Sequence, residues 1–202
     1  MEATEVAPDL WRWTGRVESI GAEAASTYIK SDRTIALVDP ILPPEDEDGF
    51  WRALDRDVRP IEASVHVVLT SANHTRQAAE MLARYPQSRL WAHREIAGEL
   101  DAAVTDVFEH GDPLPAGLTS FASGRPGESL LWLAEHRTLL VGDALAGSDR
   151  GLVLRSPEGA VAGALRELPV TDIDRVLPSH GTPVLEGAAA QLERLLADHR
   201  NA

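Results

Sequence analysis

The 202-residue sequence has no cysteine, and Lys30 is its only lysine. Without cysteine, disulfide bonds and thiolate metal sites are excluded. No apolar run approaches the roughly 20 residues that a membrane-spanning helix needs. The first residues, Met1–Glu5, are acidic and lack the basic start and apolar middle of a signal peptide. We therefore expect a cytoplasmic protein with no membrane partner.

Basic residues are also scarce. The chain has 19 Lys and Arg against 32 Asp and Glu, a formal net charge of −13. An acidic protein repels phosphate backbones, which argues against a nucleic-acid partner. The hydrophobic content of 44% and the charged content of 25% are ordinary for a globular chain. Because no linker composition interrupts the sequence, we expect a single domain over residues 1–202.

Three stretches combine a buried strand pattern with polar residues at its end. Val65–Leu69 is followed by the polar segment Thr70–Arg76, and Thr138–Val141 is followed by Asp143. A third strand pattern, residues 174–177, leads to His180. Ligands of open α/β sheets bind at the carboxyl ends of the strands. We therefore expect one shared site that these three strand ends supply.

The predicted elements alternate between antiparallel strands and strand–helix units, which indicates an α/β fold. A meander is expected first, then strand–helix units, a second meander and a last strand–helix unit. The strands are predicted at 10–14, 26–30, 34–38, 65–69, 89–93, 105–108, 118–122, 129–134, 138–141, 151–154 and 174–177. The helices are predicted at 45–58, 78–85, 94–100, 158–168 and 185–195, and residues 111–117 and 146–151 as loops without a readable signal.

Five segments in this order resemble motifs of the metallo-β-lactamase superfamily. They are Ala36-Leu37-Val38-Asp39-Pro40, Val68-Leu69-Thr70, Gly124-Arg125-Pro126-Gly127-Glu128-Ser129, Leu140-Val141-Gly142-Asp143-Ala144-Leu145 and Val176-Leu177-Pro178-Ser179-His180-Gly181. The resemblance implies an αββα four-layer sandwich, hydrolase ancestry and a dinuclear zinc site. It also implies that Asp39 orients the loop beside that site.

The metal ligands that the resemblance implies are mostly replaced. Only Asp143 and His180 match the family's ligands. At the other five positions, which belong to its His-x-His-x-Asp-His and Gly-His-x-Pro-Gly motifs, this chain has Ser71, Asn73, Thr75, Arg76 and Arg125.

These replacements argue against a dinuclear centre. Catalytic zinc normally takes three protein ligands, and a guanidinium is not a ligand. Positive charge on Arg76 and Arg125 opposes a dication, because site interiors screen charge poorly. Our hypothesis is that one or both arginines pair with Asp143 in place of the metals. No cofactor is then expected, and the alternative is a single divalent ion, zinc, iron or manganese.

His74 lies inside the altered motif at a position that varies in the family. It is a candidate third metal ligand with Asp143 and His180, a candidate general base, or a structural loop histidine. Ser71 beside it is a weaker candidate nucleophile, since no Gly-x-Ser-x-Gly motif surrounds it. The remaining histidines have no partner spacing: we expect His66 in the sheet and His93 at the surface.

Three functions stay open. The first is a relative that has lost the zinc centre and binds a small anionic molecule through Ser71, Asn73, Arg76 and Arg125, with weak or no hydrolysis. The second is a hydrolase of an ester or thioester that uses His74, Asp143 and His180, with one metal ion or none. The third is a non-catalytic structural or interaction protein. A homodimer is compatible with each.

Overall fold

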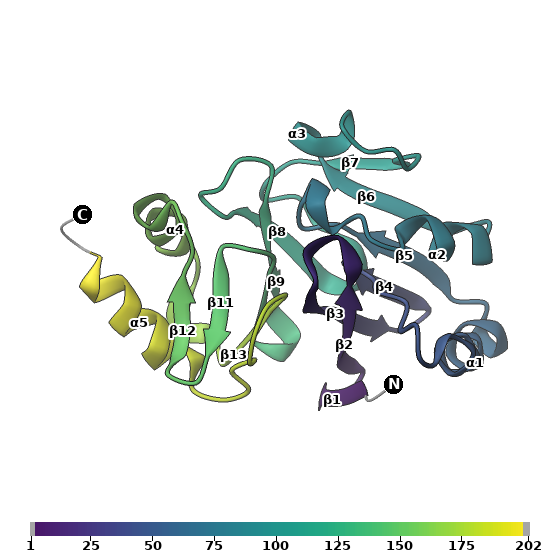
Figure 1. Cartoon of the computed structure of the whole chain (residues 1–202), viewed down its shortest axis with the longest axis horizontal. Coiled ribbons are helices and arrows are strands. Elements are labelled where there is room, and N and C mark those ends of the chain that lie inside the picture. The colour runs from purple at the N-terminus through teal and green to yellow at the C-terminus, as the bar shows by residue number, and fades with distance from the viewer. Residues whose placement is uncertain (1–2, 200–202) are drawn as a thin grey trace. The chain divides into compact units, whose positions relative to one another are not determined.

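The computed structural model describes residues 3–199, and their contacts divide the chain into two compact units, Met1–Phe108 and Glu109–Ala202. Each unit has its own sheet, helices and hydrophobic core (Figure 1). The prediction of a single domain over residues 1–202 stays a prediction. None of the helices within residues 3–199 combines the length and the apolarity needed to cross a membrane.

The first unit is built on a seven-stranded sheet whose strands follow in chain order. Pairing is antiparallel from β1 to β4 and parallel from β4 to β7. The strands are β1 (Ala3–Ala7), β2 (Leu10–Val17), β3 (Ala22–Ser31), β4 (Thr34–Val38), β5 (Ser64–Val68), β6 (Arg89–His93) and β7 (Asp106–Phe108).

Helices α1 (Glu47–Val58) and α2 (Ala78–Arg84) pack on one face of this sheet, and α3 (Arg94–Ala97) follows β6. Helix α1 begins at Glu47, two residues later than expected, because Asp46 caps it by accepting from the N–H of Gly49; Glu47 and Asp48 lie in its first turn. The core joins these helices to alternate residues of the central strands, for example Phe50 and Leu54 to Leu37 and Val67.

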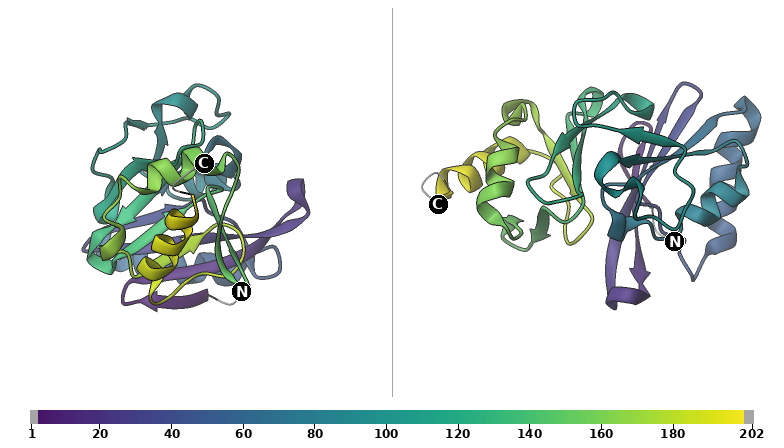
Figure 2. Two further views of the ribbon diagram at one scale, coloured as in Figure 1. Left: turned by 90° about the vertical axis from the view of Figure 1, so that its left-hand side faces the viewer. Right: turned by 90° about the horizontal axis from the view of Figure 1, so that it is seen from above.

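The second unit has a four-stranded sheet in the order β13-β10-β9-β8 and a separate hairpin, β11–β12. Strands β10 and β13 are parallel neighbours. Helices α4 and α5 lie side by side (Figure 2) and share one core with strands of both sheets. The elements are β8 (Leu118–Ala122), β9 (Ser129–Leu133), β10 (Thr138–Val141), β11 (Leu145–Ser148), β12 (Gly151–Leu154), α4 (Glu158–Leu165), β13 (Arg175–Pro178) and α5 (Ala188–Asp198).

Most predicted elements are present, with two strands added. The sequence prediction missed β1, and it treated the segment that contains β11 as a loop. The terminal helix begins at Ala188, three residues later than expected, because Gly187 adopts a left-handed conformation. His93, expected at the surface, is instead 4% exposed, and its imidazole accepts from the N–H of Glu95 at the start of α3.

Candidate functional site

In the first unit, polar side chains gather where β4 and β5 end. Asp39, Thr70 and His74 form what we call the Asp39 cluster. Asp39 Oδ1 accepts from the N–H of Thr70 at 2.9 Å, and Oδ2 accepts from the Thr70 hydroxyl at 2.6 Å. Oδ2 also lies 2.9 Å from Nδ1 of His74. Because β4 and β5 are parallel, with Val38 beside Val68, these residues leave the same edge of the sheet.

The carboxyl of Asp39 is 2% exposed, and its contacts favour the ionised form. Burial alone raises the pKa of a carboxyl. Here the charge and hydrogen bond of His74, the charge of Arg76 and the hydrogen bond of Thr70 outweigh burial, and the pKa of Asp39 lies below its ordinary value. A carboxylate has no proton to donate, so the shared proton is on Nδ1 of His74. When His74 is neutral, this contact holds the tautomer with its lone pair on Nε2.

The segment after β5 is held by Arg76, which the sequence analysis assigned to ligand binding. Its Nη1 donates to the carbonyl of Ala25 at 2.8 Å and to that of Asp39 at 2.9 Å. The guanidinium therefore ties β3 to the Asp39 cluster. Both Asp39 and Arg76 have positive φ, 48° and 42°, a backbone conformation that side chains other than glycine disfavour. These hydrogen bonds hold the chain in it.

The two other candidates of this segment lie apart from the Asp39 carboxylate. Asn73 is exposed, within a short 3₁₀ turn formed by Ala72–His74. The hydroxyl of Ser71 is buried and has no hydrogen-bond partner within residues 3–199. A nucleophilic serine needs a base within hydrogen-bond reach. The structure therefore gives no support to Ser71 as a nucleophile.

In the second unit, Asp143 and His180 lie side by side. They follow the neighbouring parallel strands β10 and β13, in which Val141 is paired with Pro178. Oδ1 of Asp143 is 3.3 Å from Nε2 of His180, and the two side chains are 20% and 22% exposed. The structure thus brings these two predicted residues together at neighbouring strand ends.

Glu128 supports the turn that carries Asp143, a role that the sequence analysis missed. Its Oε1 accepts from the N–H groups of Asp143 and Ala144, each at 2.8 Å. Its Oε2 lies 2.8 Å from Nε of Arg125. Burial and the nearby Asp143 charge raise the pKa of Glu128, while the two amides and Arg125 oppose the rise. The only sequence signal was an Arg–Glu pair three residues apart.

The partners of Arg125 correct one hypothesis. Our hypothesis was that Arg76, Arg125 or both pair with Asp143. Arg125 pairs instead with Glu128 and donates to the carbonyl of Ser156. Its charge is therefore neutralised by a buried carboxylate. The corresponding hypothesis for Arg76 and Asp143 stays a prediction.

Hairpin β11–β12 positions the turn that carries His180. The N–H of Gly147 donates to the carbonyl of His180 at 3.0 Å. A Cβ on Gly147 would lie 1.8 Å from the carbonyl oxygen of Thr182, and one on Gly181 would lie 1.9 Å from that of Gly147. Only glycine fits at these two positions. The segment at 146–151, which carried no readable sequence signal, is thus part of the support of the site.

Comparison with solved structures identifies the architecture. The metallo-β-lactamase from Pontibacter korlensis is 16% identical, with a TM-score of 0.71 over 100% of this chain and 99% of that chain. The chain has the metallo-β-lactamase fold. The enzyme from Erythrobacter litoralis is 18% identical, with a TM-score of 0.69 over 99% and 96% of the two chains. DIM-1 metallo-β-lactamase is 14% identical, with a TM-score of 0.72 over 97% and 94%.

The α/β fold expected from the sequence is therefore confirmed. No family model matches the sequence, and no curated protein matches it. Identities of 14 to 18% establish a shared metallo-β-lactamase fold but not a shared reaction, since one fold supports many chemistries. The function has to be argued from the side chains themselves.

Proposed function

We propose that this chain is a hydrolase of ester or thioester bonds that binds one divalent metal ion, with Asp143, His180 and His74 as the ligands. The observation that carries the proposal is the buried pair of Asp39 and His74. A metal-binding histidine almost always donates its other ring N–H to a carboxylate or carbonyl, which fixes its tautomer. Asp39 does this for His74 at 2.9 Å.

The donor types support a single ion. Asp143 offers a carboxylate oxygen and His180 an imidazole nitrogen, and these atoms are 3.3 Å apart. With the imidazole of His74 the set has three donors of N and O type, which suits zinc, iron(II) or manganese. Such an ion acts as a Lewis acid and lowers the pKa of bound water to about 7. Two histidines and one carboxylate also leave positions for substrate.

The residues of this chain contribute orientation. Asp39 keeps the proton of His74 on Nδ1, so that Nε2 is the atom available as a ligand or as a base. Glu128 holds the backbone N–H of Asp143, and the glycine contacts of β11 hold the turn of His180. A group held in one orientation loses little entropy when it binds.

The metal-free alternatives have less support. A pocket that binds an anion through Arg76 and Arg125 needs guanidinium groups that are open to a ligand. Arg125 is paired with Glu128, and Nη1 of Arg76 donates to two carbonyl groups. That pocket, a non-catalytic role, a homodimer, a cytoplasmic location and the absence of a nucleic-acid partner remain predictions from the sequence.

Elemental mass spectrometry tests the proposal. The full-length chain, purified without a histidine tag or chelator, is incubated with zinc, manganese or iron(II) and desalted. We expect close to one ion per chain, and at least a tenfold weaker affinity in each of Asp143→Ala, His180→Ala and His74→Ala. His136→Ala is the matched control, because the structure gives its imidazole no hydrogen bond within residues 3–199.

Asp39→Asn separates orientation from ligation. It keeps the shape of the side chain but weakens the hold on Nδ1 of His74, so metal affinity should fall about 10- to 100-fold. Hydrolysis is followed with p-nitrophenyl acetate, an acyl thioester and, because the structural neighbours are named β-lactamases, nitrocefin. Metal retention that is equal in the three ligand variants and in His136→Ala would refute the proposed site. Full metal binding without turnover of any ester or thioester would refute the hydrolase.

A further inference from the structure

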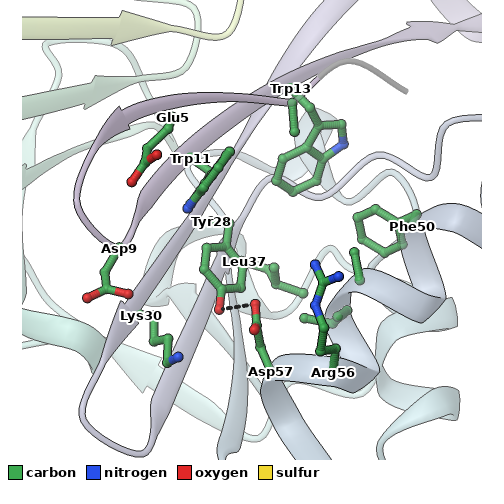
Figure 3. Close-up of a pocket in the computed structure, with 13 residues that line it drawn as sticks. Glu5, Asp9, Trp11, Trp13, Tyr28, Lys30, Leu37, Phe50, Arg56 and Asp57 are labelled. Atoms are coloured by element: carbon green, nitrogen blue, oxygen red, sulfur yellow. Dashed lines mark hydrogen bonds between the residues drawn. The ribbon is translucent and has the colours of Figure 1, made fainter.

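A cavity in the first unit lies apart from the Asp39 cluster. Its volume is about 380 Å³, and its lining comes from β1 to β4 and from α1 (Figure 3). Neither Asp39, Thr70 nor His74 lines it. Ligand pockets are typically about 300–1,000 Å³ and largely apolar, with a few polar groups that set orientation. This cavity is at the lower end of that range and suits a molecule of one or two rings.

The strand register builds the aromatic wall of the cavity. Glu5 pairs with Trp11, Trp11 with Tyr28, and Tyr28 with Leu37, so four lining residues form one row across β1 to β4. Side chains in such a row share one face of the sheet. Trp11 is half-buried, and its indole N–H has no partner within residues 3–199. It is therefore available to a ligand.

The floor of the cavity is fixed by the core. The rings of Trp13 and Phe50 have centroids 5.6 Å apart, and the indole N–H of Trp13 donates to the carbonyl of Ile41 at 2.9 Å. On the side of α1, the hydroxyl of Tyr28 donates to Oδ2 of Asp57 at 3.0 Å (Figure 3). The aromatic surfaces are thus held in place before any ligand binds.

Four further charged side chains line the cavity. They are Glu5 and Asp9 near the β1–β2 turn, Lys30 on β3 and Arg56 on α1. Within residues 3–199, none of the four forms a side-chain hydrogen bond or ion pair. The carboxylates of Glu5 and Asp9 lie on the strand side, and the guanidinium of Arg56 rises from the helix on the other (Figure 3).

The lining contains carboxylates (Glu5, Asp9 and Asp57) and cations (Lys30 and Arg56), with a net charge of −1, so the cavity favours a ligand that carries both signs. An aromatic ring in the cavity would contact Trp11, Tyr28 and Phe50. A carboxylate on the ligand would pair with Arg56, and an ammonium group with Glu5 or Asp9. An anion alone would leave the carboxylates of Glu5 and Asp9 unpaired, and a cation alone would leave Arg56 and Lys30 unpaired.

We propose that this cavity binds an aromatic amino acid or a similar small aromatic zwitterion. The proposal does not depend on the proposed hydrolase, because the two sites share no residue. It can be tested by calorimetry and ligand-observed NMR on the full chain with three probes: tryptophan, its N-acetyl derivative, which has no ammonium group, and tryptamine, which has no carboxylate.

Tryptophan is expected to bind at least tenfold more tightly than either analogue. Arg56→Gln should weaken tryptophan binding at least tenfold but leave tryptamine binding nearly unchanged. Glu5→Gln combined with Asp9→Asn should also weaken tryptophan binding, but it should leave the binding of N-acetyltryptophan nearly unchanged. Arg52→Gln is the matched control, since it lies exposed on the same helix and does not line the cavity. All of these positions are exposed, so the variants should fold.

Any of three results overturns the proposal. One is tryptamine or N-acetyltryptophan binding as tightly as tryptophan. Another is Arg56→Gln behaving like Arg52→Gln. The third is the absence of any tryptophan signal at millimolar concentration.

Discussion

Among single residues, Glu128 accepts hydrogen bonds from two backbone N–H groups and pairs with the guanidinium of Arg125. Glu128→Ala leaves the two N–H groups without this acceptor and leaves Arg125 with the carbonyl of Ser156 alone. We expect it to lower the free energy of unfolding by about 3–5 kcal/mol, the range for removing one partner of a buried ion pair. Urea unfolding measures this.

Two further variants serve as a conservative substitution and a surface control for Glu128→Ala. Glu128→Gln keeps an oxygen for the two amides but loses the charge, so its cost should be about 1–2 kcal/mol. Glu193→Ala, on the exposed face of α5, should change stability by less than about 0.5 kcal/mol. If Glu128→Ala were as mild as Glu193→Ala, the support that we assign to Glu128 would be wrong.

For single residues, the sequence predicted the positions of candidate site residues better than their hydrogen-bond partners. The placement of Asp143 and His180 near strand ends was predictable from the strand patterns, whereas the orienting role of Asp39 was implied only by the family resemblance. The partners of Arg125 and Arg76 were not, since they depend on where Glu128, Ser156 and Ala25 lie in the folded chain. Long side chains reach across several elements, and no local pattern records the choice.

Among the elements, the β11–β12 hairpin is the most sensitive to a single added carbon. Gly147→Ala places a Cβ 1.8 Å from the carbonyl oxygen of Thr182, so the His180 turn has to move. We expect a loss of about 2 kcal/mol or more and weaker metal retention. Gly159→Ala on α4 meets nothing within 4 Å and should instead stabilise the chain by about 0.5–1 kcal/mol.

Thermal and urea unfolding of the two glycine variants, with metal content measured in parallel, decide this point. Opposite signs for Gly147→Ala and Gly159→Ala are expected. Equal and small effects would show that the turn of His180 does not depend on the close contact with β11.

The contact between α1 and α2 makes stability depend on pH. Asp55 accepts from Arg59 at 2.9 Å, from Tyr85 at 2.8 Å and from Arg84. Burial opposes ionisation, but these hydrogen bonds lower the pKa of Asp55 to about 2. The pKa in the unfolded chain is about 3.9. A lowered pKa in the folded state stabilises the protein above the unfolded value and ceases to do so as pH falls toward 2.

Asp55→Asn should therefore cost about 1 kcal/mol at pH 6, a figure that allows for the exposure of the arginines. The difference from the unmodified chain should shrink steadily between about pH 4 and pH 2. Urea titrations at several pH values measure it, with the exposed Asp101→Asn as control. A difference that is independent of pH would exclude an ion-pair origin.

The elements that the sequence missed share a physical cause. Strand β1 has the sequence Ala-Thr-Glu-Val-Ala, and its pairing at the edge of the sheet, rather than its own propensity, makes it a strand. Strand β11 contains Gly147 and Ser148, which are typical of loops, and it forms because β12 pairs with it. Strands with strong apolar runs, such as β5 and β10, were predictable.

For the whole molecule, the open question is whether the two compact units unfold together. Four of the five tryptophans, Trp11, Trp13, Trp51 and Trp91, lie in Met1–Phe108, and Trp132 lies in Glu109–Ala202. In Trp132→Phe, tryptophan fluorescence therefore follows the first unit alone, whereas far-UV circular dichroism follows both. Since no linker composition separates the units, we expect the two urea transitions to coincide. Two separate midpoints would show independent domains.

The position of Lys30 has a practical consequence for labelling. Apart from the terminal amine, the chain offers amine-reactive reagents one group, and that group lines the aromatic cavity. A dye or a crosslinker can thus be attached at a known place without any mutation. A dye attached there would lie beside Trp11 and Tyr28, and its emission should change when a ligand enters the cavity. Because Lys30 is the only lysine, one dye attached there could report ligand binding in the cavity without any change of sequence.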